Sequence, residues 1–221
     1  MRALVLVLMF SSWSVAAGLP SNWAGPYSPC AGSSELLKYQ GMDIAVRIAT
    51  ANPVLAAEFR SAMNFWSTVI DMHWHESGTM FCALELVDGD AQLFEDSTVA
   101  KSQLSERAGF QGWIAFNPKA PLTRQELFFT AVHEIGHLLG LSHNPNTASV
   151  MYYTNREDSN MLDAADILSL ANRHKVLAIG GVPVSITPGL PGERSGEALN
   201  FFSPPLERHP SLSSKKVAAC R

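Results

Sequence analysis

The sequence is poor in charge and has no basic cluster. Charged residues make up 16% of its 221 residues, and the formal net charge at pH 7 is −4. It contains neither a patch of lysine and arginine nor an arginine-rich helix, so it lacks the electrostatic footprint of a nucleic-acid-binding protein. We therefore expect no nucleic acid among its partners.

Long apolar runs are missing as well. The apolar run in MRALVLVLMFSSWSVAAGLP, at the amino terminus, has about a dozen residues, whereas a membrane-spanning helix needs roughly 20. An early arginine precedes it and small residues follow it, which is typical of a secretory signal peptide rather than of a membrane anchor. We assign residues 1–17 to the signal peptide and expect no membrane contact after its removal. The mature protein is expected to be secreted, into the extracellular space or the periplasm.

Cysteine is scarce. Cys30, Cys82 and Cys220 follow the signal peptide, so the mature chain has at most one internal disulfide and one odd thiol. We favour a pair between Cys30 and Cys82, because Cys220 ends a tail without predicted structure. The other pairings stay open.

Composition divides the mature chain into three parts. Residues 18–40 are rich in glycine, proline and serine and are predicted to be an N-terminal loop segment. Residues 179–221 have the same bias with scattered charges, and such a segment cannot bury enough apolar surface to offset its ordering entropy. We predict that it is a flexible tail. Residues 41–178 form one folded domain in this division, and we expect a monomer.

Apolar periodicity predicts the elements of that domain. The strands are MDIAVRIAT, VIDMHWHES, FCALELVDGD and GWIAFNP, at residues 42–50, 69–77, 81–90 and 112–118. The helices are residues 56–70, 122–140 and 162–175. The first and last helices are expected to bury Phe59, Met63, Trp66, Ile70, Leu162, Ile167 and Leu170, and Leu177, just after the last helix, is expected to face inward as well. Thr123 and Glu126 predict a capping box for the second helix, and residues 91–109, without a clear period, are predicted to be mostly loop.

The stretch TAVHEIGHLLGLSH carries the clearest chemical pattern. Residues four apart lie on one helix face, so His133 and His137 can aim both imidazoles at one metal ion. Glu134 is rotated by about 100° from His133 and would lie beside the open metal position rather than act as a ligand. Gly140 can end the helix in a left-handed conformation, which lets the chain reverse and bring His143 back as a third ligand.

Three neutral histidines leave a fourth zinc position to water, which is the arrangement of a catalytic site. Zinc lowers the pKa of that water towards about 7, and Glu134 can take its proton during attack on a carbonyl and return it to a leaving amine. The pattern therefore predicts one catalytic Zn²⁺ ion and hydrolysis of amide bonds. A solvated helix with scattered histidines is disfavoured, since so many fixed positions rarely coincide by chance.

These residues match HExxHxxGxxH, the signature of the metzincin metallopeptidases, which the chain resembles. Ser149, Val150 and Met151 look like the methionine turn of that family, and their short distance from His143 is similar to that in matrixins. Over residues 41–178 the order of strands and helices also resembles matrixins. The resemblance implies an α+β metzincin fold, a twisted mostly parallel sheet with an antiparallel edge strand and three helices, and a secreted zinc endopeptidase.

The chain departs from the matrixin pattern at several positions. Asn144 replaces a serine, and Ala165 replaces an aspartate on which a freed amino terminus docks. Asp166 would hydrogen-bond to the methionine turn from the last helix. Tyr153 lies where other metzincins have a tyrosine that ligates zinc and stabilises the oxyanion, and a pocket-wall role is the alternative. Cys30 has a second interpretation as a thiolate that blocks the zinc, although a disulfide is favoured.

Further metal sites are less clearly indicated. The family's separate structural zinc histidines are missing between Asp88 and Gly112, so no second zinc of that kind is expected. Ca²⁺ stays an open alternative near a group of acidic residues, namely Asp88, Asp90, Glu95 and Asp96. His73 and His75 lie on one face of a strand and are interpreted as part of an exposed polar face rather than as metal ligands.

The substrate is expected to be a protein or peptide in extended conformation, paired with GWIAFNP as the edge strand. The loop from Tyr153 to Met161 would shape the main specificity pocket. Two alternatives have other functions: a zinc-stabilised binding protein or inactive homologue, and a zinc hydrolase of a non-peptide substrate. Glu134 argues against the first, since a structural zinc needs no general base.

Overall fold

The computed structural model describes residues 41–78, 83–95, 98–104, 111–155, 159–177, 183–188 and 217–218. The predicted signal peptide, the N-terminal segment, all three cysteines and most of the predicted tail lie outside these residues. The disulfide, the thiolate alternative for Cys30 and the domain boundaries therefore stay predictions.

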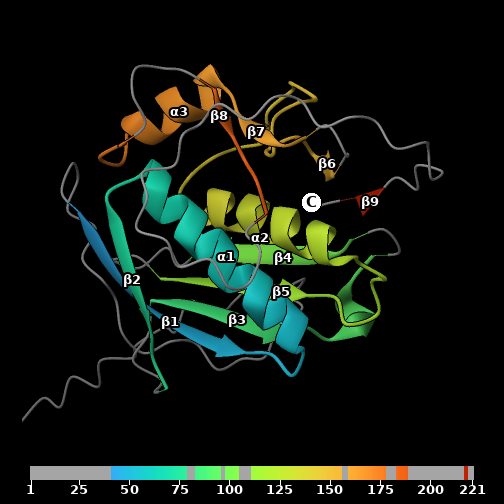
Figure 1. Cartoon of the computed structure of the whole chain (residues 1–221). Helices are drawn as coiled ribbons and strands as arrows, with labels where there is room; N and C mark the ends of the chain where they lie inside the picture. The colour runs from blue at the N-terminus through green and yellow to red at the C-terminus, as the bar shows by residue number, and fades with distance from the viewer. Residues whose placement is uncertain are drawn as a thin grey trace, which may run out of the picture.

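A twisted five-stranded sheet forms the base of the domain (Figure 1). Its strands are β1 Met42–Ala49, β2 Met72–Glu76, β3 Leu84–Asp88, β4 Ala100–Leu104 and β5 Gly112–Phe116. They lie in the order β2-β1-β3-β5-β4, and every neighbouring pair is parallel except β4 with β5. The expected mostly parallel sheet with one antiparallel edge strand is confirmed.

The identity of that edge strand was predicted wrongly. β5, which contains GWIAF, lies between β3 and β4 and is hydrogen-bonded on both sides, so no substrate can pair with it. The antiparallel edge is β4, whose sequence AKSQL falls in the stretch predicted to be mostly loop. Only Ala100 of β4 is buried, and the absence of an apolar alternation explains why periodicity missed it.

Three helices are present in the described residues, as expected: α1 Pro53–Val69, α2 Arg124–Leu138 and α3 Ala164–Ala171. α1 and α2 pack against each other and on one face of the sheet, whereas α3 lies farther from it (Figure 1). The core between them contains the four predicted residues of the first helix, all fully buried: Phe59, Met63, Trp66 and Ile70. Trp66 also donates from Nε1 to the carbonyl oxygen of Val132 at 3.1 Å, which links α1 to α2.

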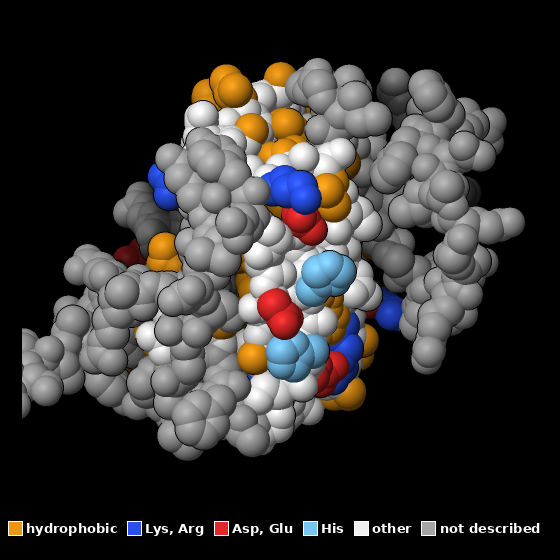
Figure 2. Space-filling view, turned by 90° about the vertical axis from the view of Figure 1, so that its left-hand side faces the viewer, with side chains coloured by type: hydrophobic (Ala, Val, Ile, Leu, Met, Phe, Trp, Pro, Cys, Tyr) orange, Lys and Arg blue, Asp and Glu red, His pale blue; other side chains and the backbone are white. Residues whose placement is uncertain are grey.

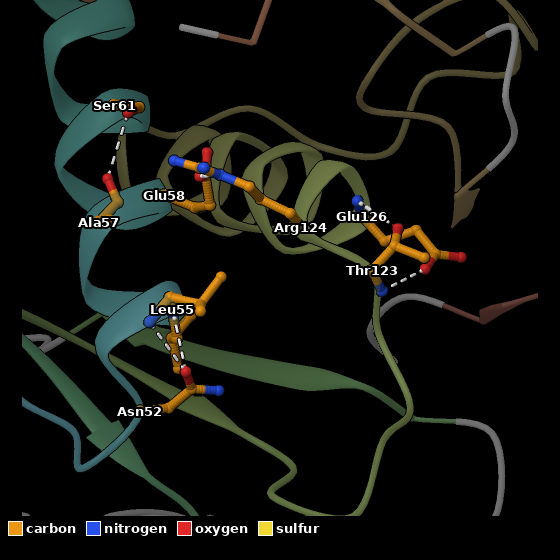
Figure 3. A network of polar contacts seen from close by, with 9 residues as sticks. Asn52, Leu55, Ala57, Glu58, Ser61, Thr123, Arg124 and Glu126 are labelled. Carbon is orange, nitrogen blue, oxygen red and sulfur yellow. Dashed lines mark hydrogen bonds and ion pairs between the residues drawn. The ribbon is translucent and has the colours of Figure 1, made fainter. Parts of the chain in front are cut away.

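The starts of α1 and α2 are both capped by side chains (Figure 3). Asn52 accepts from the backbone of Leu55 in α1. The predicted capping box of α2 is confirmed, because Glu126 N donates to Thr123 Oγ1 at 3.3 Å and Thr123 N donates to Glu126 Oε2 at 2.7 Å. Arg124, in the first turn of α2, pairs with the buried carboxylate of Glu58 on α1 (Figure 3). These contacts fix the helix that carries the histidines.

The last helix is shorter than predicted. α3 begins after Asp163, which caps it, and ends at Ala171. Leu162, Ile167 and Leu170 are buried as expected, but Leu177 is 47% exposed because it lies beyond the helix. None of the described helices combines the length and the apolar character needed to cross a bilayer.

Two small strand pairs and one short 3-10 turn complete the described structure. The turn is Ala91–Leu93, and the strand pairs are β6 Thr154–Asn155 with β9 Val217–Ala218 and β7 Met161–Leu162 with β8 Val184–Ser185. Ile186, next to β8, is buried in the main core. The described pieces of the predicted tail thus pair with strands that follow the histidine region.

Candidate metal centre

Three histidines predicted as ligands come together on one side of α2. His137 Nε2 lies 2.9 Å from His133 Nε2 and 3.2 Å from His143 Nε2. A tetrahedral zinc ion with Zn–N distances of about 2.0–2.1 Å separates its ligand nitrogens by about 3.3 Å. The three nitrogens are thus spaced as ligands of one ion would be.

The hydrogen bonds of two rings explain why these nitrogens are available. His133 Nδ1 lies 2.7 Å from the carbonyl oxygen of Val150, and His137 Nδ1 lies 2.8 Å from that of Leu141. A carbonyl oxygen only accepts, so Nδ1 of each ring carries the hydrogen and Nε2 of a neutral ring carries a lone pair. Lone pairs that face each other at this distance repel unless a cation lies between them. The arrangement therefore fits a metal ion.

Burial favours the neutral form of the three imidazoles. It lowers the pKa of His133 to about 3, with a further contribution from the neighbouring His137. Burial also lowers the pKa of His137 and of His143. Protons therefore compete weakly with a metal ion at neutral pH.

The turn after α2 brings the third histidine back. Gly140 has a φ of +94°, a left-handed conformation that side chains other than glycine rarely adopt, as its place in the motif predicted. Gly140 N donates to the carbonyl oxygen of His137, and Leu141 N donates to that of Gly136, both at 2.9 Å. These bonds end the helix and reverse the chain towards His143.

Met151 lies directly beneath the helix, as expected of a methionine turn. It is fully buried, and a Cβ on Gly136 would come within 2.6 Å of its Sδ and 3.3 Å of the Trp66 ring. Gly136 therefore allows the close approach of the turn to α2. Sequence reasoning missed this role, although a glycine inside an otherwise regular helix is a signal of close packing.

A buried polar network joins the residue after His143 to the methionine turn. Asn144, next to His143, donates from Nδ2 to Asp166 Oδ1 at 2.9 Å, and Ser149 Oγ donates to Asp166 Oδ2 at 2.7 Å. Met151 N then donates to Ser149 Oγ, and Asn144 N to the Met151 carbonyl oxygen, both at 2.9 Å. Burial raises the pKa of Asp166, and the bonds from Asn144 and Ser149 oppose that shift. The expected role of Asp166 is confirmed, and Asn144 is part of it.

Two other residues of the region have defined positions. Glu134 is fully buried on α2, one residue after His133. His174 is buried, and its Nε2 donates to the carbonyl oxygen of Leu139 at 2.7 Å, so it holds the end of the same helix. No role for His174 was found from the sequence, because its partner lies 35 residues away.

The remaining candidates lie elsewhere. Tyr153 is 54% exposed and its ring packs against Tyr152, so its link to the metal stays a prediction. Asp88 accepts from Thr50 and from the backbone of Ala51, and Asp90 caps the 3-10 turn. Among the histidine, cysteine, aspartate and glutamate side chains in the described part of the chain, one group of three has all its ligand atoms within 4.8 Å of one another, and it consists of His133, His137 and His143. Asp96 is outside that part.

Comparisons with known proteins agree with this geometry. The family model of the matrixins (peptidase M10) matches residues 38–174, more than half of the chain. The macrophage metalloelastase of Rattus norvegicus is 31% identical to the chain over 150 residues. That match covers 60% of this chain and 31% of the relative, so the chain spans about a third of the length of the curated relative it matches.

Proposed function

Because the chain belongs to the matrixin family, we propose that it is a secreted zinc-dependent endopeptidase with one catalytic zinc ion. His133, His137 and His143 would hold the ion through Nε2. The observation that carries this proposal is the convergence of their lone pairs, with the other nitrogen of two rings tied to backbone carbonyls.

The chemistry divides between the metal and the protein. When bound, zinc would supply Lewis acidity, which polarises the scissile carbonyl and lowers the pKa of water. Glu134 would take the proton of the attacking water and deliver it to the leaving amine. Its burial beside His133 supports this role, since a carboxylate shielded from solvent interacts more strongly with developing charge.

We place the substrate on β4 instead of β5. Among the described strands β4 pairs only with β5, so its other edge can accept an extended peptide through main-chain hydrogen bonds. Such pairing selects loops or unfolded segments of protein substrates. The segment from Tyr153 to Met161, which includes β6, would then shape the pocket for a substrate side chain.

Cleavage of a mixed peptide library tests the proposal. The mature protein is incubated with and without a chelator, alongside Glu134→Ala and the exposed control Glu76→Ala, and the zinc content of each protein is measured. We expect chelator-sensitive cleavage by the wild type and the control, and zinc without cleavage in Glu134→Ala. Intact peptides in every reaction would favour a zinc-stabilised binding protein or a hydrolase of other substrates.

The finer parts of the proposal need their own measurements. Secretion predicts that protein recovered outside the cytoplasm begins near Gly18, which amino-terminal sequencing can check. Light scattering should give the mass of a monomer.

If Tyr153 stabilises the oxyanion, Tyr153→Phe lowers kcat at unchanged zinc content, whereas a pocket-wall role leaves kcat unchanged. A calcium site would appear as a rise in Tm with Ca²⁺ in zinc-loaded protein.

A further inference from the structure

A second group of metal-ligand side chains lies on the face of the sheet away from α1 and α2. In β2, Met72 and Trp74 pack towards the core, while His73 and His75 are exposed on the opposite face. In β1, Asp43 is exposed between two buried residues. Figure 2, which views the side of the molecule where β2 lies, shows two histidine side chains with acidic side chains beside them.

Strand register places these three side chains together. Asp43 pairs with His73, and Ala45 pairs with His75. Because Ala45 is small, the space beside His75 is open to Asp43, whose Oδ1 lies 3.4 Å from His75 Nδ1. His73 and His75 are two positions apart on one strand, a separation of about 6.6 Å between their Cα atoms. Two imidazoles on such a face can reach one ion between them.

Nearby charged groups leave Asp43 available. Asp71, two residues before His73, pairs with Lys175 at 2.7 Å. Glu76, one residue after His75, pairs with Arg60. The carboxylate of Asp43 faces His75 instead, and its side chain is 76% exposed.

We infer that Asp43, His73 and His75 form a second metal site, which takes a transition-metal ion of the imidazole-binding class such as Zn²⁺, Cu²⁺ or Ni²⁺. Two imidazoles and a carboxylate suit these ions and not Ca²⁺ or Mg²⁺, which prefer oxygen ligands. The three ligand atoms are not as closely gathered as those of the His133 group. They are solvent-exposed, so rotation about their side-chain bonds costs rotamer entropy but no packing.

A metal ion there would join β2, the outer strand of the sheet, to β1. Binding to the folded state alone raises stability with ligand concentration, so the ion would protect the β2 edge. This site is independent of peptide hydrolysis. Its failure would leave the proposed peptidase function untouched, and the reverse is also true.

Copper titration of protein that carries a single equivalent of Zn²⁺, which the better-oriented α2 group takes first, tests the site when followed by electron paramagnetic resonance. We expect wild-type protein to take up a further equivalent of Cu²⁺ with a spectrum split by two nitrogens. His73→Ala and His75→Ala should each reduce the splitting to one nitrogen, and the double variant should lose the signal. Asp43→Asn should weaken binding, while Glu76→Gln, on the other face of β2, should not.

Two outcomes would overturn the inference. One is that wild type carrying a single equivalent of Zn²⁺ binds no Cu²⁺ at micromolar concentrations. The other is a spectrum that is unchanged in the double variant, which would assign the copper to the amino terminus or another group. Because the three side chains are exposed, the variants should keep the Tm of metal-free wild type, which confirms that they fold.

Discussion

The chain has two groups of histidines that are built in opposite ways. At α2, His133 is buried and His137 half-buried, and these two rings are held by the backbone carbonyls of Val150 and Leu141 before any ion arrives. On β2, His73 and His75 are exposed, and within the described residues neither ring donates to a backbone carbonyl. The side chains of the first group therefore lose their rotamer freedom when the protein folds, whereas those of the second group lose it only when an ion binds. The difference predicts which group holds a metal tightly and which only weakly.

Replacement of one histidine from each group should show the largest contrast. His137→Ala removes a proposed ligand whose Nε2 lies 2.9 Å from that of His133 and 3.2 Å from that of His143. Even hydrogen-bond partners of ligands are worth about 10–100-fold in metal affinity or activity, so we expect a loss above about 100-fold in kcat/KM. His75→Ala should leave kcat/KM unchanged. Equal losses in both variants, measured with a fluorogenic peptide and zinc analysis, would remove the distinction.

Breaking the hydrogen-bond network around Asp166 should have the next largest effect, which is a loss of unfolding free energy. Asn144→Ala removes the donor to Asp166, and a buried carboxylate oxygen without its partner costs about 1–3 kcal/mol. Asn144→Ser, the residue of the matrixin pattern, tests whether a hydroxyl restores the bond. Urea unfolding of zinc-loaded protein measures the change.

The control for that experiment is Asn146→Ala. Asn146 also donates to an aspartate, Asp163, but this bond is exposed, so we expect a smaller loss of unfolding free energy. A loss as large as that of Asn144→Ala would mean that burial of the Asp166 network is not the cause.

Parts of the two groups were predictable from sequence, for local reasons. The spacing of His133 and His137 follows from helix geometry, the strand face of His73 and His75 from the alternation of β2, and the conformation of Gly140 from its place after the helix. Each of these depends on residues a few positions apart, where periodicity is informative.

The other features of the fold and of the two histidine groups depend on contacts between residues that are distant in sequence. Asn144 and Ser149 reach Asp166 across 22 and 17 residues, so Asn144 was seen only as a departure from a pattern. β4 is partly polar and lacks an apolar alternation, hence its strand identity comes from pairing with β5. The pairing of Asp43 with the β2 histidines likewise required the register of two strands.

A smaller loss of unfolding free energy is expected from a substitution where α2 approaches the methionine turn. In Gly136→Ala the new Cβ meets Met151 Sδ at 2.6 Å in a fully buried site, and overpacking costs about 1–3 kcal/mol. Alanine regains about 1 kcal/mol of helix propensity, so we expect a net loss of up to about 2 kcal/mol. Gly78→Ala, whose Cβ would meet nothing within 4 Å, is the matched control in the same unfolding assay. Stabilisation by Gly136→Ala would show that Met151 moves aside freely.

The smallest effect concerns the pH dependence of stability and a buried histidine outside the metal centre. Burial lowers the pKa of His174 below its ordinary value of 6.5, and its hydrogen bond to Leu139 opposes the shift. As pH falls through 6.5, the unfolded chain takes up a proton before the folded protein does. The stability present above pH 6.5 is then lost, by at most about 1.4 kcal/mol per pH unit, until the folded pKa is reached. In His174→Gln, which keeps a donor for the Leu139 carbonyl, the unfolding free energy of zinc-loaded protein should fall less steeply between pH 7.5 and 5.5 than in wild type. Because the proposed zinc ligands are the same in both proteins, parallel curves would show that His174 does not contribute to the pH dependence.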